Sequence, residues 1–253
     1  AVVSGRPPQL NRVDEMVGLF TNTIPVRVRL DPTRTVGELL RQIQSEQAGL
    51  LEHHYLGLAD IQSAAGGVGL FDTLVAYESY PIDAEGLQQA GGSIDGLEVV
   101  DISSMTYTHY PVTVVVEPGT RLRCRVWYRR DTVTEPAARS LTELLRAAVD
   151  RFIGVAPQTA LAAPVDWWRA PGALAEQPEL PADRPRPAMA SQRRAQVHLD
   201  LPAEVDIALS DIARQRETTV FAVVHAALAI LLARLSGTRD VAVGAFASEI
   251  GRA

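Results

Sequence analysis

Apolar and polar side chains alternate in several short stretches of the chain, and each of these stretches predicts a β-strand. Residues 24–30 (IPVRVRL) carry apolar side chains at every second position, with two arginines between them. This period of two is typical of a half-buried strand, and Pro25 favours a place near a strand start or at a sheet edge. Residues 70–80 (LFDTLVAYESY) predict a buried strand, and residues 110–116 and 121–128 predict a hairpin around a Pro-Gly type II turn.

Other stretches follow the helical period of 3.6 residues. Thr35 and Glu38 have the spacing of a capping box, and a broad apolar stripe continues from there to Leu50. The sequence therefore predicts a helix that ends close to the pair His53-His54. Residues 135–153 predict a second amphipathic helix, whose first turn tolerates a proline.

The pattern after residue 190 predicts two more strands with helices between them. Residues 195–201 (AQVHLDL) predict a strand, and a helix follows it. Residues 220–235 are apolar on nearly every face of a helix, which indicates a buried helix between a Thr-Thr cap and a Ser-Gly stop. Residues 240–246 (DVAVGAF) predict a fully buried strand. Because strands and helices alternate throughout, the fold class is α/β or α+β in two layers.

Prolines mark a break in this pattern. Seven of the 16 prolines lie between residues 154 and 190, so we expect a linker or an extended surface crossing there. The chain accordingly divides into residues 1–153, a Pro-rich linker or junction over residues 154–190, and residues 191–253.

Composition and charge argue against several functional classes. The net charge is −6 and no block of basic residues stands out, which argues against nucleic acid as a partner. The longest apolar run is interrupted by His225 and Arg234 and falls short of a bilayer span, so we expect no membrane partner. No signal peptide is visible at the start of the sequence.

Cysteine and arginine usage bear on the cellular setting. Cys124 is the single cysteine, which excludes an internal disulfide framework and suits a reducing cytoplasm. It shares the apolar face of its predicted strand, which favours a core residue over a nucleophile. All 24 basic residues are arginine; together with abundant alanine, this suggests a GC-rich genome, as in actinobacteria.

The residues alone show no self-contained active site. The sequence has no phosphate-binding glycine loop, no Cys/His metal spacing and no G-x-S-x-G elbow. His225, in an apolar helix, predicts a core residue whose nitrogens are hydrogen-bonded. His109 and His198 have no visible partner. The adjacent His53 and His54, followed by Asp60, resemble half of an acyltransferase site.

Several segments, taken together, resemble the condensation domains of nonribosomal peptide synthetases. Residues 3–30 (VSGRPPQLNRVDEMVGLFTNTIPVRVRL) resemble the G-R-P and G-L/F-F-x-N-T segment of that family. Residues 46–81, containing EHHYLGLADI and LFDTLVAYESYP, resemble the part that follows. Residues 120–153 resemble its closing strand and helix. Residues 179–187 (ELPADRPRP) and the segment from Thr218 to the final IGRA resemble an earlier part of the same domain.

The resemblance implies a chloramphenicol-acetyltransferase-like lobe, with a mixed sheet and flanking helices. Two such lobes meet at a tunnel, where the family passes a donor acyl group to the α-amine of an acceptor and forms a peptide bond. The substrates are thioesters on phosphopantetheine, which donor and acceptor carrier proteins present, so no cofactor is bound directly. The implied partners are these carrier proteins, an adjacent adenylation domain and the other, N-terminal lobe.

The family's catalytic signature, H-H-x-x-x-D-G, is absent from these residues. The pair His53-His54 is followed by YLGLAD, so Asp60 stands too far along and Ile61 replaces the glycine. The resemblance also places the pair in the second lobe, whereas the signature belongs to the first. We therefore interpret His53 and His54 as a look-alike and expect no catalytic residue in this chain.

The segments stand in an unusual order. In the family, the part resembling residues 179–253 precedes the part resembling residues 1–153, and here it follows it. Two interpretations fit. Either the chain runs from one condensation domain into part of another, with material lost near residues 164–167, or it is a lobe whose late part precedes its early part.

By resemblance, Arg6 and Asn22 match polar residues at or near the tunnel, and Arg252 is the matching position in the second Gly-Arg pair. Arg6 has a competing structural interpretation as an ion-pair partner of Asp14 or Glu15. Asn22 has one as a residue that satisfies backbone groups at a strand start. At the level of function, the alternative to a condensation enzyme is a non-catalytic module that docks carrier proteins or tailoring enzymes.

Overall fold

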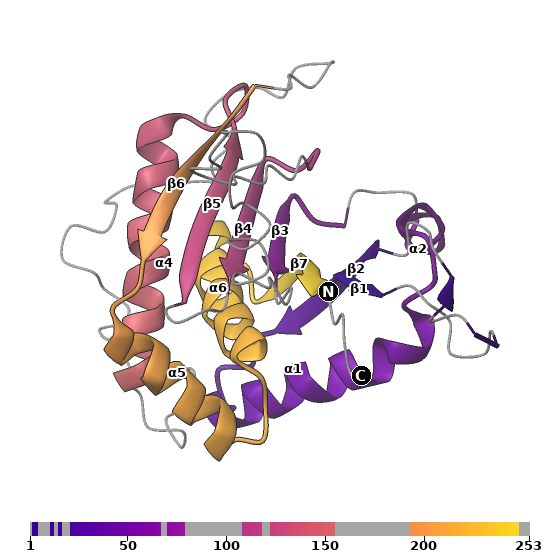
Figure 1. Ribbon diagram of the computed structural model, residues 1–253, viewed down its shortest axis with the longest axis horizontal. Helices are drawn as coiled ribbons and strands as arrows, with labels where there is room; N and C mark the ends of the chain where they lie inside the picture. The colour runs from indigo at the N-terminus through magenta and orange to yellow at the C-terminus, as the bar shows by residue number, and fades with distance from the viewer. Residues whose placement is uncertain are drawn as a thin grey trace, which may run out of the picture.

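The computed structural model describes most of both segments that flank the Pro-rich region (Figure 1). The described residues are 2–4, 11–12, 15–16, 21–66, 70–78, 108–117, 122–154 and 193–247. The Pro-Gly turn at residues 118–121 and nearly all of the predicted linker lie outside them.

The described strands form one mixed sheet of seven strands in the order β1-β2-β7-β3-β4-β5-β6. Strand β3 is parallel to β4 and to β7, and every other neighbouring pair is antiparallel. The strands are β1 (Val2–Ser4), β2 (Thr21–Arg29), β3 (Thr73–Tyr77), β4 (Val112–Glu117), β5 (Arg123–Arg129), β6 (Arg194–Asp200) and β7 (Asp240–Ala247). The predicted hairpin is confirmed, because β4 and β5 pair antiparallel from Val112–Tyr128 to Glu117–Arg123.

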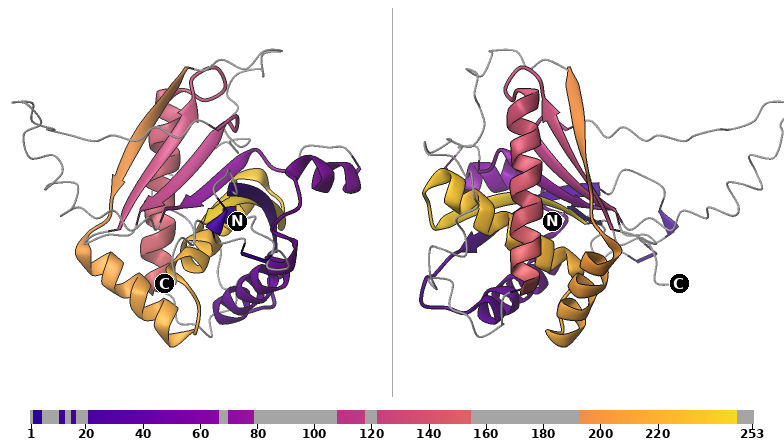
Figure 2. Two further views of the ribbon diagram at one scale, coloured as in Figure 1. Left: turned by 45° about the vertical axis from the view of Figure 1, so that its right-hand side comes forward. Right: turned by 90° about the vertical axis from the view of Figure 1, so that its left-hand side faces the viewer.

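Helices pack against one face of this sheet (Figures 1 and 2). They are α1 (Val36–Leu50), α4 (Glu135–Gly154), α5 (Ala203–Gln215) and α6 (Val220–Ser236). A 3₁₀ turn, η2 (Leu51–His53), and the short helix α2 (Leu58–Ala64) follow α1. The predicted α/β fold class, a mixed sheet with flanking helices, is confirmed. Among the described residues no single helix has the length and apolar character of a bilayer span; α5 and α6 reach it only as a pair bent by 104°.

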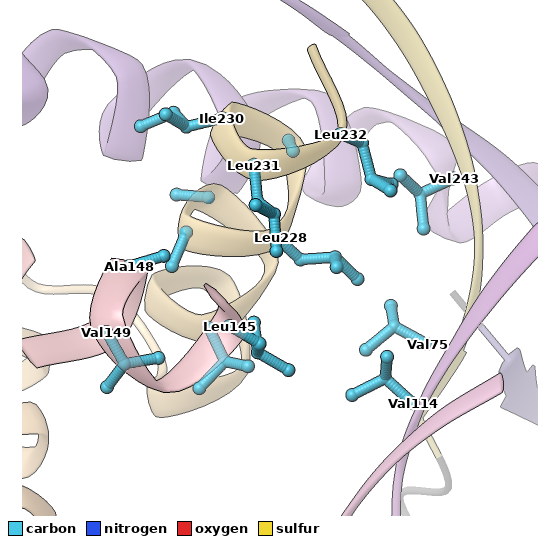
Figure 3. Close-up of a cluster of buried hydrophobic side chains, with 14 of the residues drawn as sticks. Val75, Val114, Leu145, Ala148, Val149, Leu228, Ile230, Leu231, Leu232 and Val243 are labelled. Carbon is cyan, nitrogen blue, oxygen red and sulfur yellow. The ribbon is translucent and has the colours of Figure 1, made fainter. Parts of the chain in front are cut away.

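The main core lies between the sheet and these helices. Strands β2, β4 and β5 each contribute every second side chain to it, for example Val26, Val114 and Val126. Cys124 belongs to the same cluster, so its predicted place in the core is confirmed. Figure 3 shows Leu228 and Leu232 of α6 reaching toward the strands that carry Val75 and Val243.

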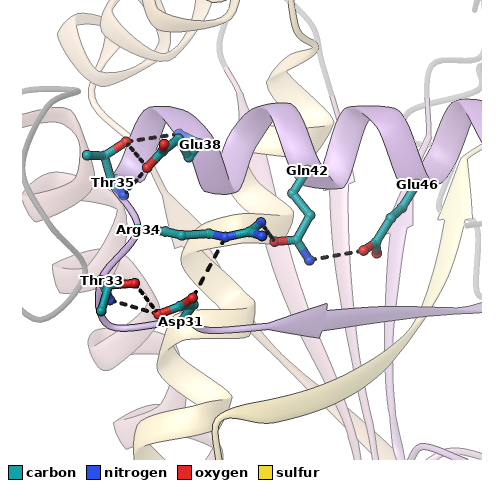
Figure 4. A network of polar contacts seen from close by, with 7 residues as sticks. All are labelled: Asp31, Thr33, Arg34, Thr35, Glu38, Gln42 and Glu46. Carbon is teal, nitrogen blue, oxygen red and sulfur yellow. Dashed lines mark hydrogen bonds and ion pairs between the residues drawn. The ribbon is translucent and has the colours of Figure 1, made fainter.

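The turn from β2 into α1 is fixed by the polar residues that the sequence predicted (Figure 4). Thr35 Oγ1 accepts from the backbone N–H of Glu38, and the Glu38 carboxylate accepts from the Thr35 N–H, which confirms the capping box. Before it, Asp31 accepts hydrogen bonds from the backbone and hydroxyl of Thr33. These contacts start α1 at Val36 and so direct its apolar stripe onto the sheet.

Helix α6 is buried on every side, as its composition predicts. Thr219 caps its start by accepting from the Ala222 N–H, and Gly237 ends it with φ 68°. Such a positive φ favours glycine. His225 is fully buried at 0% exposure, but neither ring nitrogen has a hydrogen-bond partner within the described structure. The predicted hydrogen bonds are therefore wrong for His225, because apolar and aromatic groups such as the Phe221 ring surround it.

Strand β7 occupies the middle of the sheet, between β2 and β3. Val243 points into the main core, so Gly244 points to the opposite face, which none of the described helices covers. There the ring of Phe71 lies directly over Gly244, where a Cβ would overlap it. The two segments that flank the Pro-rich region thus share one sheet and one core.

Candidate functional site

Asn22, one of the predicted site residues, stands at the start of β2 and faces the turn that follows η2. Its Nδ2 donates to the carbonyl oxygen of His54 at 2.7 Å and to that of Leu56 at 2.6 Å. Its Oδ1 accepts from the backbone N–H of Thr23 at 2.9 Å. Both amide hydrogens are therefore used by the backbone, which agrees with the structural interpretation of this residue.

The histidine pair lies in that same turn, with its two rings in different environments. His53 is exposed, whereas His54 is only 8% exposed. Burial, with the neighbouring positive charge of His53 as a smaller cause, lowers the pKa of His54 to about 4. Asp60 is exposed in the first turn of α2. No carboxylate of the described residues is among the groups that perturb the pKa of His54.

This environment limits what His54 can do chemically. A general base works best when its pKa lies near the working pH, and a pKa of about 4 leaves His54 neutral but weakly basic at pH 7. A catalytic imidazole also needs a group that orients it, usually a carboxylate. The geometry thus supports the interpretation of the pair as a look-alike.

This turn exposes two large apolar side chains beside the polar Glu52 and His53. Leu51 is 58% exposed and Tyr55 is 50% exposed, one on each side of the histidine pair. The Asn22 amide holds the turn that carries Tyr55 against the sheet. Tyr55 is therefore presented by a backbone that is held in place by hydrogen bonds.

A second polar group lies on the face of the sheet opposite the main core. The Arg125 guanidinium pairs with the Glu117 carboxylate and lies 4.0 Å from that of Glu78. It also stands 5.8 Å from the ring centre of Trp127. Burial, followed by the charge of Glu117, raises the pKa of Glu78. These groups are mostly buried, although alternation along the strand had placed Arg125 simply on the outer face.

The register of the hairpin explains this cluster and could have predicted it. Glu117 pairs with Arg123, so Arg125 is its diagonal neighbour on the same face. Further along β5, Arg129 donates to the Asp131 carboxylate at 2.7 Å and to the His109 carbonyl at 3.1 Å. Sequence reasoning missed both arginines as buried polar groups because two of the partners, Glu117 and the His109 carbonyl, are brought close only by strand pairing.

Metal or thiol chemistry finds no support in the part of the chain that is described. Within it, no group of three His, Cys, Asp or Glu side chains is placed to hold a metal ion. Burial raises the pKa of the Cys124 thiol to about 12, so the reactive thiolate is disfavoured.

Comparison with known proteins identifies the family. Residues 1–163 match the family model described as a condensation domain. The chain belongs to the condensation-domain family. This agrees with the resemblance of its motifs to nonribosomal peptide synthetases. The match ends at residue 163, so the kinship of residues 179–253 rests on their motifs and on their place in the shared sheet.

Relatives of this condensation domain are large synthetases. Over 151 residues it is 40% identical to vanchrobactin synthetase VabF of Vibrio anguillarum, covering 60% of this chain and 5% of that protein. Over 120 residues it is 38% identical to chondramide synthase cmdD of Chondromyces crocatus, covering 46% and 3%. Surfactin synthase subunit 3 of Bacillus subtilis (strain 168) is 31% identical over 152 residues, covering 60% and 12%. The chain thus spans a small part of each relative.

The remaining predicted site residues of this condensation domain, Arg6 and Arg252, lie outside the described residues. So do Asp14 and the Trp-Trp junction at residues 167–168. Of the three predicted tunnel residues, the described part of the chain contains Asn22 alone.

Proposed function

We propose that this chain supplies the second lobe of a nonribosomal peptide synthetase condensation domain and depends on a separate lobe for its catalytic histidine. In this proposal the complete domain joins a donor acyl group to the α-amine of an acceptor, both carried as thioesters. One observation carries the proposal: residues 1–163 match the family, yet the sequence lacks H-H-x-x-x-D-G.

The turn after α1 supports the dependence on another lobe. It holds the nearest look-alike of the signature, and there His54 is buried, with its pKa lowered to about 4. Asn22 fixes the same turn through two backbone carbonyls. A buried, weakly basic imidazole such as that of His54, in a turn held in place, is suited to shaping a wall beside a tunnel. It is poorly suited to moving a proton.

Arg6, Asn22 and Arg252 remain our candidates for the side of the tunnel. Condensation domains act on phosphopantetheinyl-bound substrates, so polar groups at the mouth of a tunnel would meet the amides of the pantetheine arm. For Asn22, Oδ1 is the atom left for such a contact, because only one of its two lone pairs accepts a hydrogen bond from Thr23. The expected partners are the donor and acceptor carrier proteins and the adjacent adenylation domain.

We assign residues 1–153 to the late part of the lobe and residues 191–253 to its early part, joined through residues 154–190. The shared sheet supports this assignment, because β7 fills a position between β2 and β3 that the first segment leaves open. We further propose a cytoplasmic location, since the lone cysteine suits a reducing compartment.

The test is a condensation assay with carrier proteins loaded with donor and acceptor aminoacyl groups. Alone, the purified chain should give no dipeptidyl thioester above background. The parent polypeptide that contains H-H-x-x-x-D-G should give product, and replacement of the second histidine of its signature by alanine should abolish it. Product from the chain alone would overturn the proposal.

The absent signature also favours a second candidate, a non-catalytic module that binds carrier proteins. If the parent polypeptide lacks the signature everywhere and forms no product, yet the chain still binds a loaded carrier protein, this second candidate is the correct one. Titration of the carrier protein, monitored by calorimetry, measures this binding directly.

A further inference from the structure

We propose that residues 193–247 form a detachable unit that completes the sheet of residues 2–154 without a covalent link, and that a second copy of this chain can supply it. The unit comprises β6, α5, α6 and β7. Its partner surface is the helix-covered face and the open strand edges of residues 2–154.

Strand pairing is the first argument. Strand β7 pairs with β2 from Ile24–Ala245 to Arg29–Asp240, and with β3 from Leu74–Gly244 to Tyr77–Ala247. Without β7, the described strands of residues 2–154 fall into two separate groups, β1-β2 and β3-β4-β5. Residues 2–154 therefore present two facing edges that one strand fits between, antiparallel to one edge and parallel to the other.

Packing is the second argument. Helix α6 is buried from Phe221 to Ala233, and its contacts include both α1 and α4 of the other segment. Figure 3 shows Leu228 and Leu231 of α6 on the same side as Leu145 and Ala148 of α4. An apolar helix of this kind is poorly soluble alone, so both parts favour association.

Two contacts make the fit specific. Gly244 leaves the space that the Phe71 ring fills. Arg27 donates to both carboxylate oxygens of Asp240, at 2.8 and 2.5 Å, and so sets the register of β7 on β2. Each contact joins the detachable unit to the first segment, and a second copy of the chain offers the same groups.

The covalent connection between the parts places little restriction on which copy supplies the unit. Residues 155–192, fully extended, would reach roughly 120 Å, several times the length of any element in the sheet. Exchange of an identical element between copies is a low-cost route of association, because it reuses the contacts of the single chain.

The test uses the full chain with a specific protease site inserted between residues 170 and 175. After cleavage under native conditions, the two pieces should still elute together at the mass of the uncleaved chain, near 27.4 kDa. If the two pieces separate, the proposal is overturned, whether or not either piece stays folded.

Exchange between copies is measured by mixing equal amounts of cleaved, isotope-labelled chain and cleaved, unlabelled chain in denaturant, and then diluting the mixture. Native mass spectrometry should find about half of the complexes as hybrids, the statistical expectation for equal partners. A Gly244→Ala substitution in the labelled copy should reduce its share of the β7-containing pieces in the complexes several-fold. His198→Gln, an exposed substitution in the same piece, should leave that share unchanged.

The uncleaved chain, refolded in the same way, is the reference for recovery. If it refolds while the cleaved mixture gives no complexes, the covalent connection is required and the proposal is wrong. If complexes form but none is a hybrid, a second copy does not supply the unit, and that result also contradicts the proposal.

Discussion

Asn22 Nδ2 lies 2.7 Å from the carbonyl oxygen of His54, a residue 32 positions further along the chain. With the second bond, to Leu56, this contact joins the start of β2 to the turn that carries the histidine pair. Both carbonyls lie in a part-buried environment, where each loses water as an alternative partner. One side chain therefore fixes the position of His54 and of the exposed Tyr55 beside it.

Replacing Asn22 by Asp should destabilise the protein. The change puts a carboxylate in place of the donor that faces two carbonyl oxygens, so both hydrogen bonds are lost and like partial charges meet. We expect the free energy of unfolding to fall by roughly 2–4 kcal/mol, measured by urea denaturation. Gln196→Glu makes the matched amide-to-acid change on an exposed position of β6 and should have little effect. Equal stability of the two variants would contradict the role of Asn22.

Gly244→Ala should destabilise the centre of the sheet, because the new methyl group overlaps the Phe71 ring. We expect a loss of about 1–3 kcal/mol, the usual cost of overpacking, seen as a lower midpoint of thermal unfolding. Gly49→Ala is the control: no atom lies within 4 Å of its added Cβ, and alanine favours the helix. Adding Phe71→Ala to Gly244→Ala should reduce the incremental cost of the glycine substitution, and a strictly additive result would exclude the clash.

His225 should make the stability depend on pH. Burial lowers its pKa to about 3 from an ordinary value of 6.5, so between these values the unfolded chain binds a proton that the folded chain excludes. Its contribution to stability is complete above pH 6.5 and is lost as the pH falls, by about 1.4 kcal/mol per unit.

His225→Leu removes this titrating group together with two ring nitrogens that have no hydrogen-bond partner in the described structure. Urea unfolding at pH 7.5, 6.0 and 5.0 measures the free energy of unfolding of both proteins. As the pH falls, this free energy should decrease less for the variant than for the natural protein. His198→Gln removes an exposed histidine and serves as the control. A constant difference between His225→Leu and the natural protein across this range would rule out the buried histidine as the cause.

His54→Ala, made in the intact parent polypeptide, should leave turnover within a few-fold of the natural rate. The buried imidazole is a weak base, and the prediction gives it no part in acyl transfer. The same substitution should lower stability, since it removes a buried ring. Replacement of the exposed His53 by alanine should lower neither the turnover nor the stability. A loss of turnover on the order of 10²–10⁴, typical of a general base, would show that the pair is catalytic.

Local structure was predictable from the sequence because its causes are local. The capping box at Thr35 and Glu38, the stripe of α1 and the apolar surface of α6 each depend on residues within one element. The neighbours of β7 were not predictable. A run of apolar residues indicates a buried strand but does not say which strands lie on either side, since pairing depends on segments about 200 residues apart.

Polar side chains divide in the same way. Alternation along β5 predicted which face of the sheet carries Arg125. The diagonal contact of Arg125 with Glu117 was not predictable, because it depends on the register of the hairpin. The apolar composition of α6 predicted that His225 is buried. It did not predict that the two ring nitrogens lack hydrogen-bond partners in the described structure. For Asn22 the sequence offered a tunnel role and a backbone role, and the backbone contacts account for both of its donor hydrogens.

The central place of β7 also affects the order of events during synthesis. Strands β2 and β3 leave the ribosome long before residues 240–247 are made, so each has an unpaired edge throughout that interval. The sheet closes only when its late segment arrives, through contacts of high sequence separation, which form slowly. Until β7 is made, these edges of β2 and β3 stay open to pairing with other strands, so this part of the sheet closes late.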